Sequence, residues 1–248
     1  MLRDPTPKTV YMFCYTSGTT GDPKGAKMLH EMFLACHNLI VHGRLAFTEN
    51  DISISYLPMA HIFEQFNLFS SLCYGFSHGF YGGDPLKLLD DIAVLKPTHL
   101  ATVPRILNRV HGKVFDGVKA AGGFKKWLFE KAVRDKLYNL QHYNKVTHST
   151  YDKVFQKVRD LFGGRIRTMV TASAPISGEV LSFFKIALGI HIYEVYGQTE
   201  TNGPATFTSP DDPTAGHVGG CFPGFRLRLR DVPEMSYFST DNPPRGEI

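Results

Sequence analysis

The stretch Thr16-Ser17-Gly18-Thr19-Thr20-Gly21-Asp22-Pro23-Lys24-Gly25 follows residues 9–15, an apolar run with the composition of a β-strand. Its three glycines allow positive φ angles and a close approach of the backbone to a ligand. Its four hydroxyls and the Lys24 ammonium are suitable donors to phosphate oxygens. A glycine turn with incidental polarity is the alternative, but the density of donors directly after a strand favours phosphate binding. The stretch is not a P-loop, because Pro23 and Gly25 flank the lysine where that motif has Gly and Ser or Thr.

Strand and helix signals alternate along the rest of the chain. Apolar β-rich runs predict strands at residues 52–57, 79–81, 99–103, 167–172 and 190–195. Helical spacing and start signals predict helices at residues 32–47, 63–74, 84–96, from 104 onward, and 178–188. This alternation predicts an α/β fold with layered sheets flanked by helices.

Two segments differ from this pattern. Residues 119–162 are rich in Lys, Tyr and Gln and contain no strand signal, so we expect two helices lying over the main fold. Residues 231–245 have no periodicity and predict a surface connection, and residues 246–248 resemble the start of another strand. We therefore expect residues 1–248 to form part of one domain, with 119–162 as a helical insert within it.

Composition excludes several classes of protein. With 248 residues, 43% hydrophobic and 20% charged, the chain has an ordinary globular composition. A net charge of +4 with scattered basic residues gives no indication of nucleic acid binding. The four cysteines lie far apart without metal-ligand spacing, which favours reduced thiols in an intracellular protein. The least charged stretch, residues 65–83, contains too many polar residues for a membrane-spanning helix.

Three motifs together resemble those of adenylate-forming (AMP-binding) enzymes. Residues 16–25 are similar to the phosphate loop of that superfamily. Thr171-Ala172-Ser173-Ala174-Pro175 resembles its small-residue turn along the adenine ring, and Tyr193-Glu194-Val195-Tyr196-Gly197-Gln198-Thr199-Glu200 is similar to its adenine and metal motif. Each motif alone is moderately specific, whereas three in the right order are strongly indicative.

Within that superfamily, the chain resembles the long-chain fatty acyl-CoA synthetases of eukaryotes. Residues 57–64, 103–109, 161–165 and 214–219 carry this resemblance, as does the insert at 119–162. The resemblance covers essentially the whole chain. It implies the central part of the large N-terminal domain, with a later aspartate motif and the small lysine-bearing C-terminal domain absent from these residues.

The resemblance implies ATP-dependent activation of a long-chain fatty acid to an acyl-adenylate and then to acyl-CoA. Attack of a carboxylate on the α-phosphate forces two anions together, so cations and N–H donors are needed. Mg²⁺, which prefers hard oxygen ligands, is expected at Thr16 and Glu200, and coenzyme A is the co-substrate. The expected catalytic residues are Lys24, His61, Thr199 and Glu200. The expected nucleotide-binding residues are Thr16, Ser17, Gly18, Thr19, Thr20, Gly21, Lys24, Ser173, Ala174, Pro175, Glu194, Tyr196, Gly197, Gln198 and Thr199.

Some of these residues have simpler interpretations. A lone histidine such as His61 is more often a satisfied core histidine, and Glu200 is also consistent with a helix-start acid. Glu64 would need a third ligand to form a metal site with His61, so we reject that site. The apolar residues that follow His61 are consistent with an acyl tunnel and equally with plain helix core: Phe63, Phe66, Leu68 and Phe69.

Two other functions are consistent with the motifs. One is an adenylating ligase for a different carboxylic acid. The other is a non-catalytic nucleotide- or lipid-binding module, should the native chain end at residue 248. The expected partners are a long-chain fatty acid, ATP and coenzyme A, without nucleic acid, and with membrane association only through parts outside this chain. The resemblance implies the cytoplasmic face of an intracellular membrane or the cytoplasm, and we expect the 248-residue chain alone to be inactive.

Overall fold

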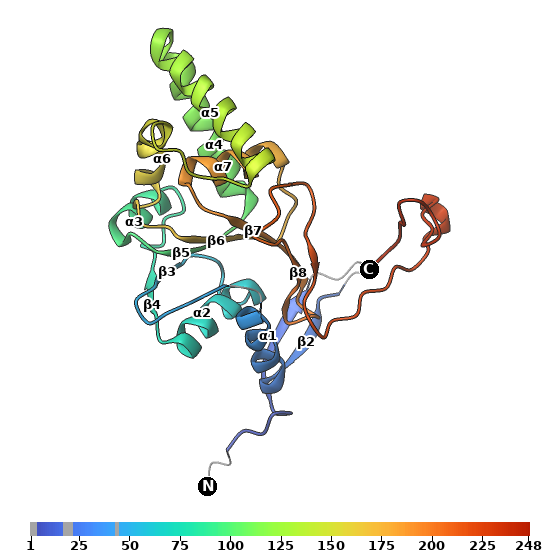
Figure 1. Cartoon of the computed structure of the whole chain (residues 1–248). Coiled ribbons are helices and arrows are strands. Elements are labelled where there is room, and N and C mark those ends of the chain that lie inside the picture. Colours follow the sequence, from blue (N-terminus) through green and yellow to red (C-terminus); the bar gives the residue numbers. More distant parts are fainter. Residues whose placement is uncertain (1–3, 17–21, 43–44) are drawn as a thin grey trace.

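The computed structural model describes residues 4–16, 22–42 and 45–248 and has an α/β fold (Figure 1). Its largest sheet has the order β5-β6-β7-β8-β9, in which β5, β6 and β7 are parallel and the last two pairs are antiparallel. These strands are β5 His99–Thr102, β6 Thr168–Thr171, β7 Ile192–Gln198, β8 Gly203–Phe207 and β9 Gly220–Cys221. The prediction of an α/β fold is confirmed.

Two smaller sheets complete the strands. β3 (Ile52–Ser55) and β4 (Ser77–Phe80) are parallel, and β3 lies beside the start of β5, since the Thr98 amide donates to the Ile52 carbonyl at 2.8 Å. β1 (Val10–Thr16) and β2 (Lys24–Leu29) form an antiparallel hairpin in which Thr16 pairs with Lys24. The hairpin packs away from the parallel strands, next to α1 (His30–His42) and α2 (Ile62–Tyr74) (Figure 1).

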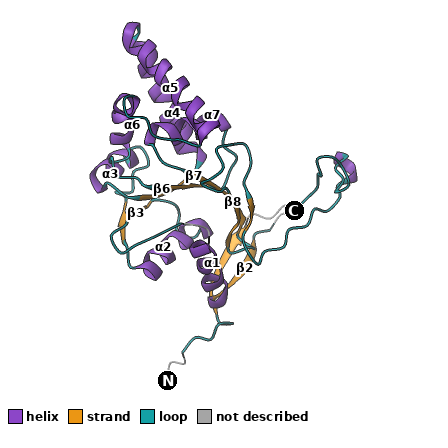
Figure 2. Cartoon of the chain, viewed as in Figure 1, coloured by secondary structure: helices purple, strands orange, loops and turns teal. Residues whose placement is uncertain are grey.

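Helices cover both faces of the sheet. α4 (Pro104–Ala121), α5 (Gly123–Tyr143) and α7 (Gly178–Leu188) lie on one side, and α1 and α2 lie on the other (Figure 2). α3 (Leu88–Leu95) and α6 (Gln156–Leu161) lie at the β3 edge, and 3₁₀ turns span Tyr151–Phe155 and Pro233–Met235. The α4–α5 hairpin projects beyond the body of the molecule (Figure 1).

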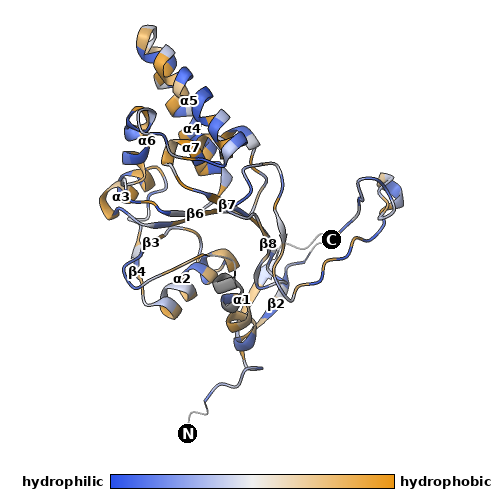
Figure 3. Cartoon of the chain, viewed as in Figure 1, coloured by the Kyte–Doolittle hydropathy of each residue, from blue (hydrophilic) through white to orange (hydrophobic). Residues whose placement is uncertain are grey.

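The main hydrophobic core lies between the sheet and the α4, α5 and α7 side. Its centre is aromatic: Phe155, Phe162, Phe183 and Phe184 are at most 1% exposed. Apolar residues recur along α7 (Figure 3), which buries all of its residues from Val180 to Leu188 except Ser182. Burial of each such side chain contributes roughly 1.5–3 kcal/mol, so this side supplies most of the hydrophobic stabilisation.

Local signals explain the best-predicted helices. The Ser177 hydroxyl accepts a hydrogen bond from the Val180 amide at 3.3 Å, and Gly189 ends α7 with a left-handed φ of 72°. Pro104 occupies the first turn of α4, where its missing N–H is not needed. The prediction for residues 178–188 is confirmed with the same bounds.

Several predicted elements differ from the structure. Lys24 and Gly25, predicted in a loop, begin strand β2, and neither β2, β8 nor β9 was predicted. The helix predicted at 84–96 begins only at Leu88, because residues 85–87 form a turn, and the helix predicted at 32–47 spans His30–His42. Residues 119–162 hold the end of α4, the long α5 and the short α6 rather than two helices. At the last residues, Glu247 forms an isolated antiparallel bridge with Arg230.

None of the helices in the described part of the chain is long and apolar enough to cross a membrane.

Candidate active site

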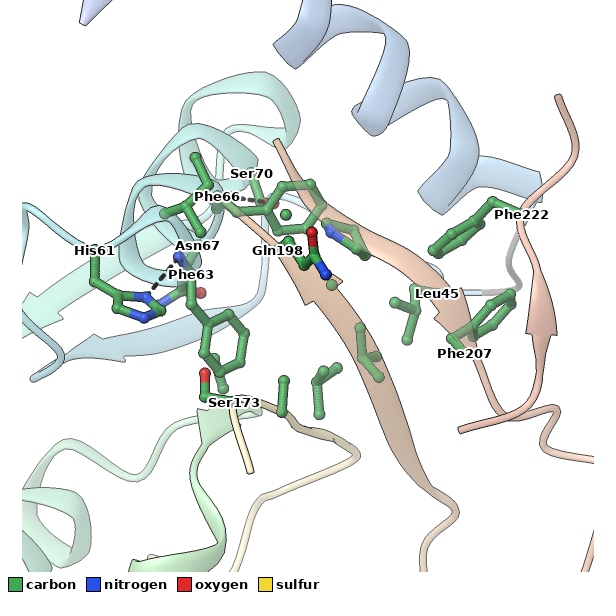
Figure 4. A pocket seen from close by; sticks show the side chains of 18 of the residues that line it. Leu45, His61, Phe63, Phe66, Asn67, Ser70, Ser173, Gln198, Phe207 and Phe222 are labelled. Carbon is green, nitrogen blue, oxygen red and sulfur yellow. Dashed lines mark hydrogen bonds between the residues drawn. The ribbon is translucent and has the colours of Figure 1, made fainter. Parts of the chain in front are cut away.

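A cavity of about 250 Å³ lies between α2 and strands β5 to β8 (Figure 4). Most of its wall is apolar, formed by Leu45, Phe47, Ile62, Phe63, Phe66, Ala101, Val170, Ala172, Val195, Pro204, Phe207 and Phe222. No lysine, arginine, aspartate or glutamate is among the described residues that line it. Such a cavity is suited to a long apolar group with a few polar contacts.

Three separate segments contribute polar residues to the wall of this cavity, and the part with His61 is called its polar end below. They are His61 before α2, Ser173 after β6, and the Gly197–Thr199 end of β7. His61 is the N-cap of α2, and its Nδ1 accepts a hydrogen bond from the Phe63 amide at 3.1 Å. A neutral ring that accepts at Nδ1 carries its proton on Nε2, so this histidine presents an N–H donor on its exposed side.

One hydroxyl forms hydrogen bonds across the β7–β8 turn. Thr201 Oγ1 accepts from the Gln198 amide at 2.9 Å and lies 2.7 Å from the Gly203 carbonyl oxygen. A Cβ at Gly197 would lie 2.0 Å from that same oxygen, so this position requires glycine. The turn thereby fixes Thr199 and Glu200 at its tip. Sequence reasoning missed the role of Thr201, which followed directly after the motif.

Not all residues of the predicted nucleotide motifs line the cavity. Along β7, Val195 and Gly197 face it, whereas Glu194 and Tyr196 alternate to the other side. Burial raises the pKa of the Glu194 carboxyl, and the nearby charges of His217 and Lys185 oppose that shift. Tyr196 Oη accepts from Gln198 Nε2 at 2.7 Å. Ala174 and Pro175 are exposed and follow Ser173 away from the cavity.

The β1–β2 hairpin adjoins the polar end of the cavity. Cys14 Sγ donates to the Ala60 carbonyl at 3.2 Å, directly before His61. Cys36, on the helix that follows the hairpin, contacts the β7–β8 turn through the Asn202 carbonyl, 3.6 Å from Sγ. The hairpin therefore contacts the His61 segment directly, and α1 contacts the β7–β8 turn. The predicted phosphate-binding residues Ser17, Gly18, Thr19, Thr20 and Gly21 lie outside the described residues.

The two charged candidates are open to solvent. Lys24 and Glu200 are exposed, and neither forms an ion pair with another described residue. No group of three or more His, Cys, Asp or Glu residues within the described ranges is arranged to hold a metal ion. Mg²⁺ commonly binds through one or two carboxylates together with nucleotide phosphates.

The apolar residues after His61 divide into two groups. Phe63 and Phe66 line the cavity, whereas Leu68 and Phe69 do not. Phe69 instead packs against Phe33 of α1, with ring centroids 4.9 Å apart. Sequence reasoning missed three polar lining residues, Asn67, Ser70 and His99, because nothing in their local pattern distinguishes them from core or surface positions.

A two-sided α/β domain with these motifs around one cavity is typical of an adenylating domain. The chain belongs to the AMP-binding enzyme family, whose model matches residues 2–248. Similar curated proteins include the peroxisomal long chain acyl-CoA synthetase 6 of Arabidopsis thaliana, 42% identical over 98% of this chain and 35% of the relative. Long-chain-fatty-acid–CoA ligase 5 of Mus musculus is 42% identical over 98% of this chain and 36% of its own length. The chain thus spans about a third of the length of these relatives.

Solved structures agree with the fold. The adenylation domain of a carboxylate reductase from Mycobacterium chelonae superimposes with a TM-score of 0.66 at 26% identity, over 97% of this chain and 33% of that one. The A-PCP didomain of a carboxylic acid reductase from Segniliparus rugosus, solved in complex with AMP, gives a TM-score of 0.64 at 25% identity over 98% of this chain and 30% of that one. The family resemblance drawn from the three motifs is confirmed.

Proposed function

We propose that the native protein activates a long-chain fatty acid with ATP to an acyl-adenylate and transfers the acyl group to coenzyme A. The observation that carries this proposal is the mainly apolar cavity to whose wall three separate segments, at His61, Ser173 and Gly197–Thr199, contribute polar groups. An acyl chain would occupy the apolar part, and its carboxylate would lie at the end with His61, Ser173 and Thr199. The identity of about 40% to long-chain acyl-CoA synthetases favours a fatty acid over other carboxylic acids.

Each polar residue has a distinct part in this proposal. The exposed Nε2–H of His61 would donate to the fatty-acid carboxylate and orient it. Thr199, fixed at the tip of the β7–β8 turn, would contact the α-phosphate. Lys24 would offset the negative charge that builds up as pyrophosphate leaves.

Glu200 and the Thr16 hydroxyl would hold Mg²⁺ together with the phosphates of ATP. Bound there, the ion would neutralise phosphate charge. The exposure of Glu200 and its lack of an ion pair among the described residues are consistent with this role. Glu200→Gln removes the charge and keeps the shape, so it should raise the Mg²⁺ requirement more than the fatty-acid requirement. A change in the apparent affinity for fatty acid alone would place Glu200 in the acyl site instead.

The test uses the native full-length protein with ATP, Mg²⁺, palmitate and coenzyme A, and follows palmitoyl-CoA by mass spectrometry and pyrophosphate exchange by radioactivity. Lys24→Ala should slow exchange roughly tenfold to a hundredfold, since a charged hydrogen bond contributes about 1.5–3 kcal/mol. Lys27→Ala, at an exposed position on the same strand, is the matched control and should leave exchange unchanged.

Two outcomes would replace the proposal. Turnover of an aromatic or amino acid in preference to palmitate would indicate a ligase for another carboxylic acid. Binding of AMP or fatty acid without any exchange would indicate a binding module.

A further inference from the structure

Two polar side chains in the cavity wall have atoms without a hydrogen-bond partner among the described residues. Asn67 of α2 is 3% exposed, and neither its amide nitrogen nor its amide oxygen has a hydrogen-bond partner among the described residues. His99 at the start of β5 is 5% exposed, and its Nδ1 likewise has none in the described part of the chain. Both residues line the cavity, and Figure 4 shows Asn67 there beside Phe63 and Phe66.

Ser70, on the same helix, is a buried polar residue whose hydrogen bonds are made within the protein. Ser70, also in the wall, donates to the Phe66 carbonyl at 2.8 Å and lies 3.0 Å from His37 Nε2. Its hydroxyl therefore needs nothing from the cavity. Buried polar groups in folded proteins almost always have a partner in the protein, in water or in a ligand. Because Asn67 and His99 line the cavity, a ligand or water in it can supply that partner.

These groups are offset along their secondary-structure elements from His61 and from the residues after β6. Asn67 follows His61 by six residues, or roughly 9 Å along the axis of α2. His99 pairs in register with Thr168, four residues before Ala172, which places it roughly 13 Å along the strands from that residue. A ligand whose carboxylate lies at the His61 end would meet Asn67 and His99 along its chain.

The chemistry of the two groups selects a neutral oxygen. Burial lowers the pKa of His99 to about 4, so its ring is neutral at physiological pH and offers one donor and one acceptor nitrogen. The Asn67 amide also offers both a donor and an acceptor. With no lysine, arginine or acidic residue among the described lining residues, a charged substituent would have no counter-ion. A hydroxyl can accept from the Asn67 amide nitrogen or donate to its oxygen, whereas a carbonyl can only accept.

We propose that the cavity selects fatty acids that carry a hydroxyl or carbonyl group within the acyl chain, and that Asn67 determines this specificity. The inference rests on the proposed function for the orientation of the acid. An unsubstituted chain would leave the Asn67 amide buried against methylene groups. A site built to hydrogen-bond a substituent discriminates strongly against the analogue that lacks it.

The experiment compares palmitate with hydroxypalmitates that carry the hydroxyl at successive positions. The native full-length protein is assayed for kcat/KM with ATP and coenzyme A, and separately for binding by displacement of a fluorescent fatty acid. We expect one position, or a few adjacent ones, to be preferred over palmitate by roughly tenfold. Asn67→Leu, which keeps the size of the side chain, should abolish that preference, and Asn67→Ala is a second variant should Leu impair folding. The control Asn50→Leu, in an exposed turn, should retain it.

The outcomes separate this inference from the proposed function. Turnover of palmitate with no positional preference in either assay would overturn the inference alone, and would assign a buried water to Asn67. A positional preference in binding that is lost in Asn67→Leu supports the inference, even where no acyl-CoA is formed and the proposed function fails. A preference that persists in both Asn67 variants would overturn the role of Asn67.

Discussion

Helices α2 and α7 lie on opposite sides of the same sheet and bury opposite kinds of side chain (Figure 1). α7 buries seven apolar residues and Lys185, whereas α2 buries one apolar residue, Ile62, with Glu64, Asn67, Ser70 and Ser71. Burying apolar groups stabilises a fold, while burying polar groups does so only when they are paired. The contrast indicates that α7 serves stability, whereas α2 places two of its buried polar residues, Asn67 and Ser70, in the wall of the cavity.

Buried polarity is not in itself a sign of function. Asp51 is 2% exposed, yet Arg167 Nε donates to its Oδ1 at 2.7 Å, Thr98 Oγ1 at 2.5 Å, and the Thr48 amide to Oδ2 at 2.8 Å. These hydrogen bonds link Asp51, which directly precedes β3, to Thr98 and Arg167, which directly precede β5 and β6. The relevant difference is thus between polar groups that the protein satisfies and those, such as Asn67, that it leaves unpartnered.

The largest effect on the free energy of unfolding is expected for a substitution in the apolar core beside α7. Phe184 of α7 is fully buried and packs edge-on against Phe162 and Phe183, with centroids 5.8 and 5.2 Å away. Phe184→Ala should lower the free energy of unfolding by about 3–5 kcal/mol, measured by urea denaturation. The control Phe124→Ala, at a 71% exposed position, should change it by less than about 0.5 kcal/mol. A loss below about 1 kcal/mol at Phe184 would contradict the assignment of stability to this side.

The second largest effect is expected for Asp51, a buried carboxylate whose hydrogen bonds are made within the protein. Burial alone would raise the pKa of Asp51, but the hydrogen bonds from Arg167 and Thr98 hold it well below its usual range. Because the folded-state pKa is depressed, the stability from Asp51 is fully present above the unfolded value of about 4 and is lost as the pH falls below it. Asp51→Asn should lower the free energy of unfolding at pH 7 by about 2–3 kcal/mol.

Denaturation of both proteins between pH 7 and pH 2 provides the measurement. The difference between wild type and Asp51→Asn should shrink on acidification below about pH 4. A difference that stays constant down to pH 2 would show that the carboxylate charge contributes nothing.

The sequence predicted elements that have strong local signals. α7 was predicted with the observed bounds because a capping serine, an apolar run and a terminal glycine coincide. β2 was missed because only Met28 of its six residues is buried, and β8 because it contains Gly203 and Pro204, which disfavour strands. These strands are stabilised by pairing with the strands that precede them in the sequence, β1 and β7, so they depend on contacts outside their own segments.

The candidate site was predictable to a similar extent. His61, Ser173 and Thr199 belong to separate motifs, and the structure places all three on one cavity. Asn67 and His99 carry no motif, and an asparagine within a helical pattern normally indicates a solvent-facing position. Their importance arises from what surrounds them after folding, which no local pattern encodes.

The third prediction concerns the turn at the polar end of the cavity. A Cβ at Gly197 would collide with the Gly203 carbonyl oxygen, so Gly197→Ala must displace the backbone of β7 or β8. We expect a loss of about 1–3 kcal/mol in the free energy of unfolding. Gly220→Ala on β9, where a Cβ would meet nothing within 4 Å, is the matched control and should stay close to wild type. Equal stability of the two variants would mean that the turn adapts freely and does not fix Thr199.

The smallest expected effect is an increase in the free energy of unfolding. It compares a buried side chain on α2 that lacks a hydrogen-bond partner with one that has partners. Asn67→Leu replaces an unpartnered amide by an apolar group of similar size in an apolar wall, so it should raise the free energy of unfolding of the ligand-free protein by about 1 kcal/mol. Ser70→Ala, one turn further along α2, removes a hydroxyl that is bonded to Phe66 and His37 and should lower it by about 1 kcal/mol. Urea denaturation of both variants without fatty acid provides the measurement. Asn67 is 3% and Ser70 is 2% exposed and both line the same cavity, so burial does not distinguish them, whereas their hydrogen bonding does. A loss of stability in Asn67→Leu would show that the amide has a partner in the folded protein, and the reason for assigning it to a ligand would disappear.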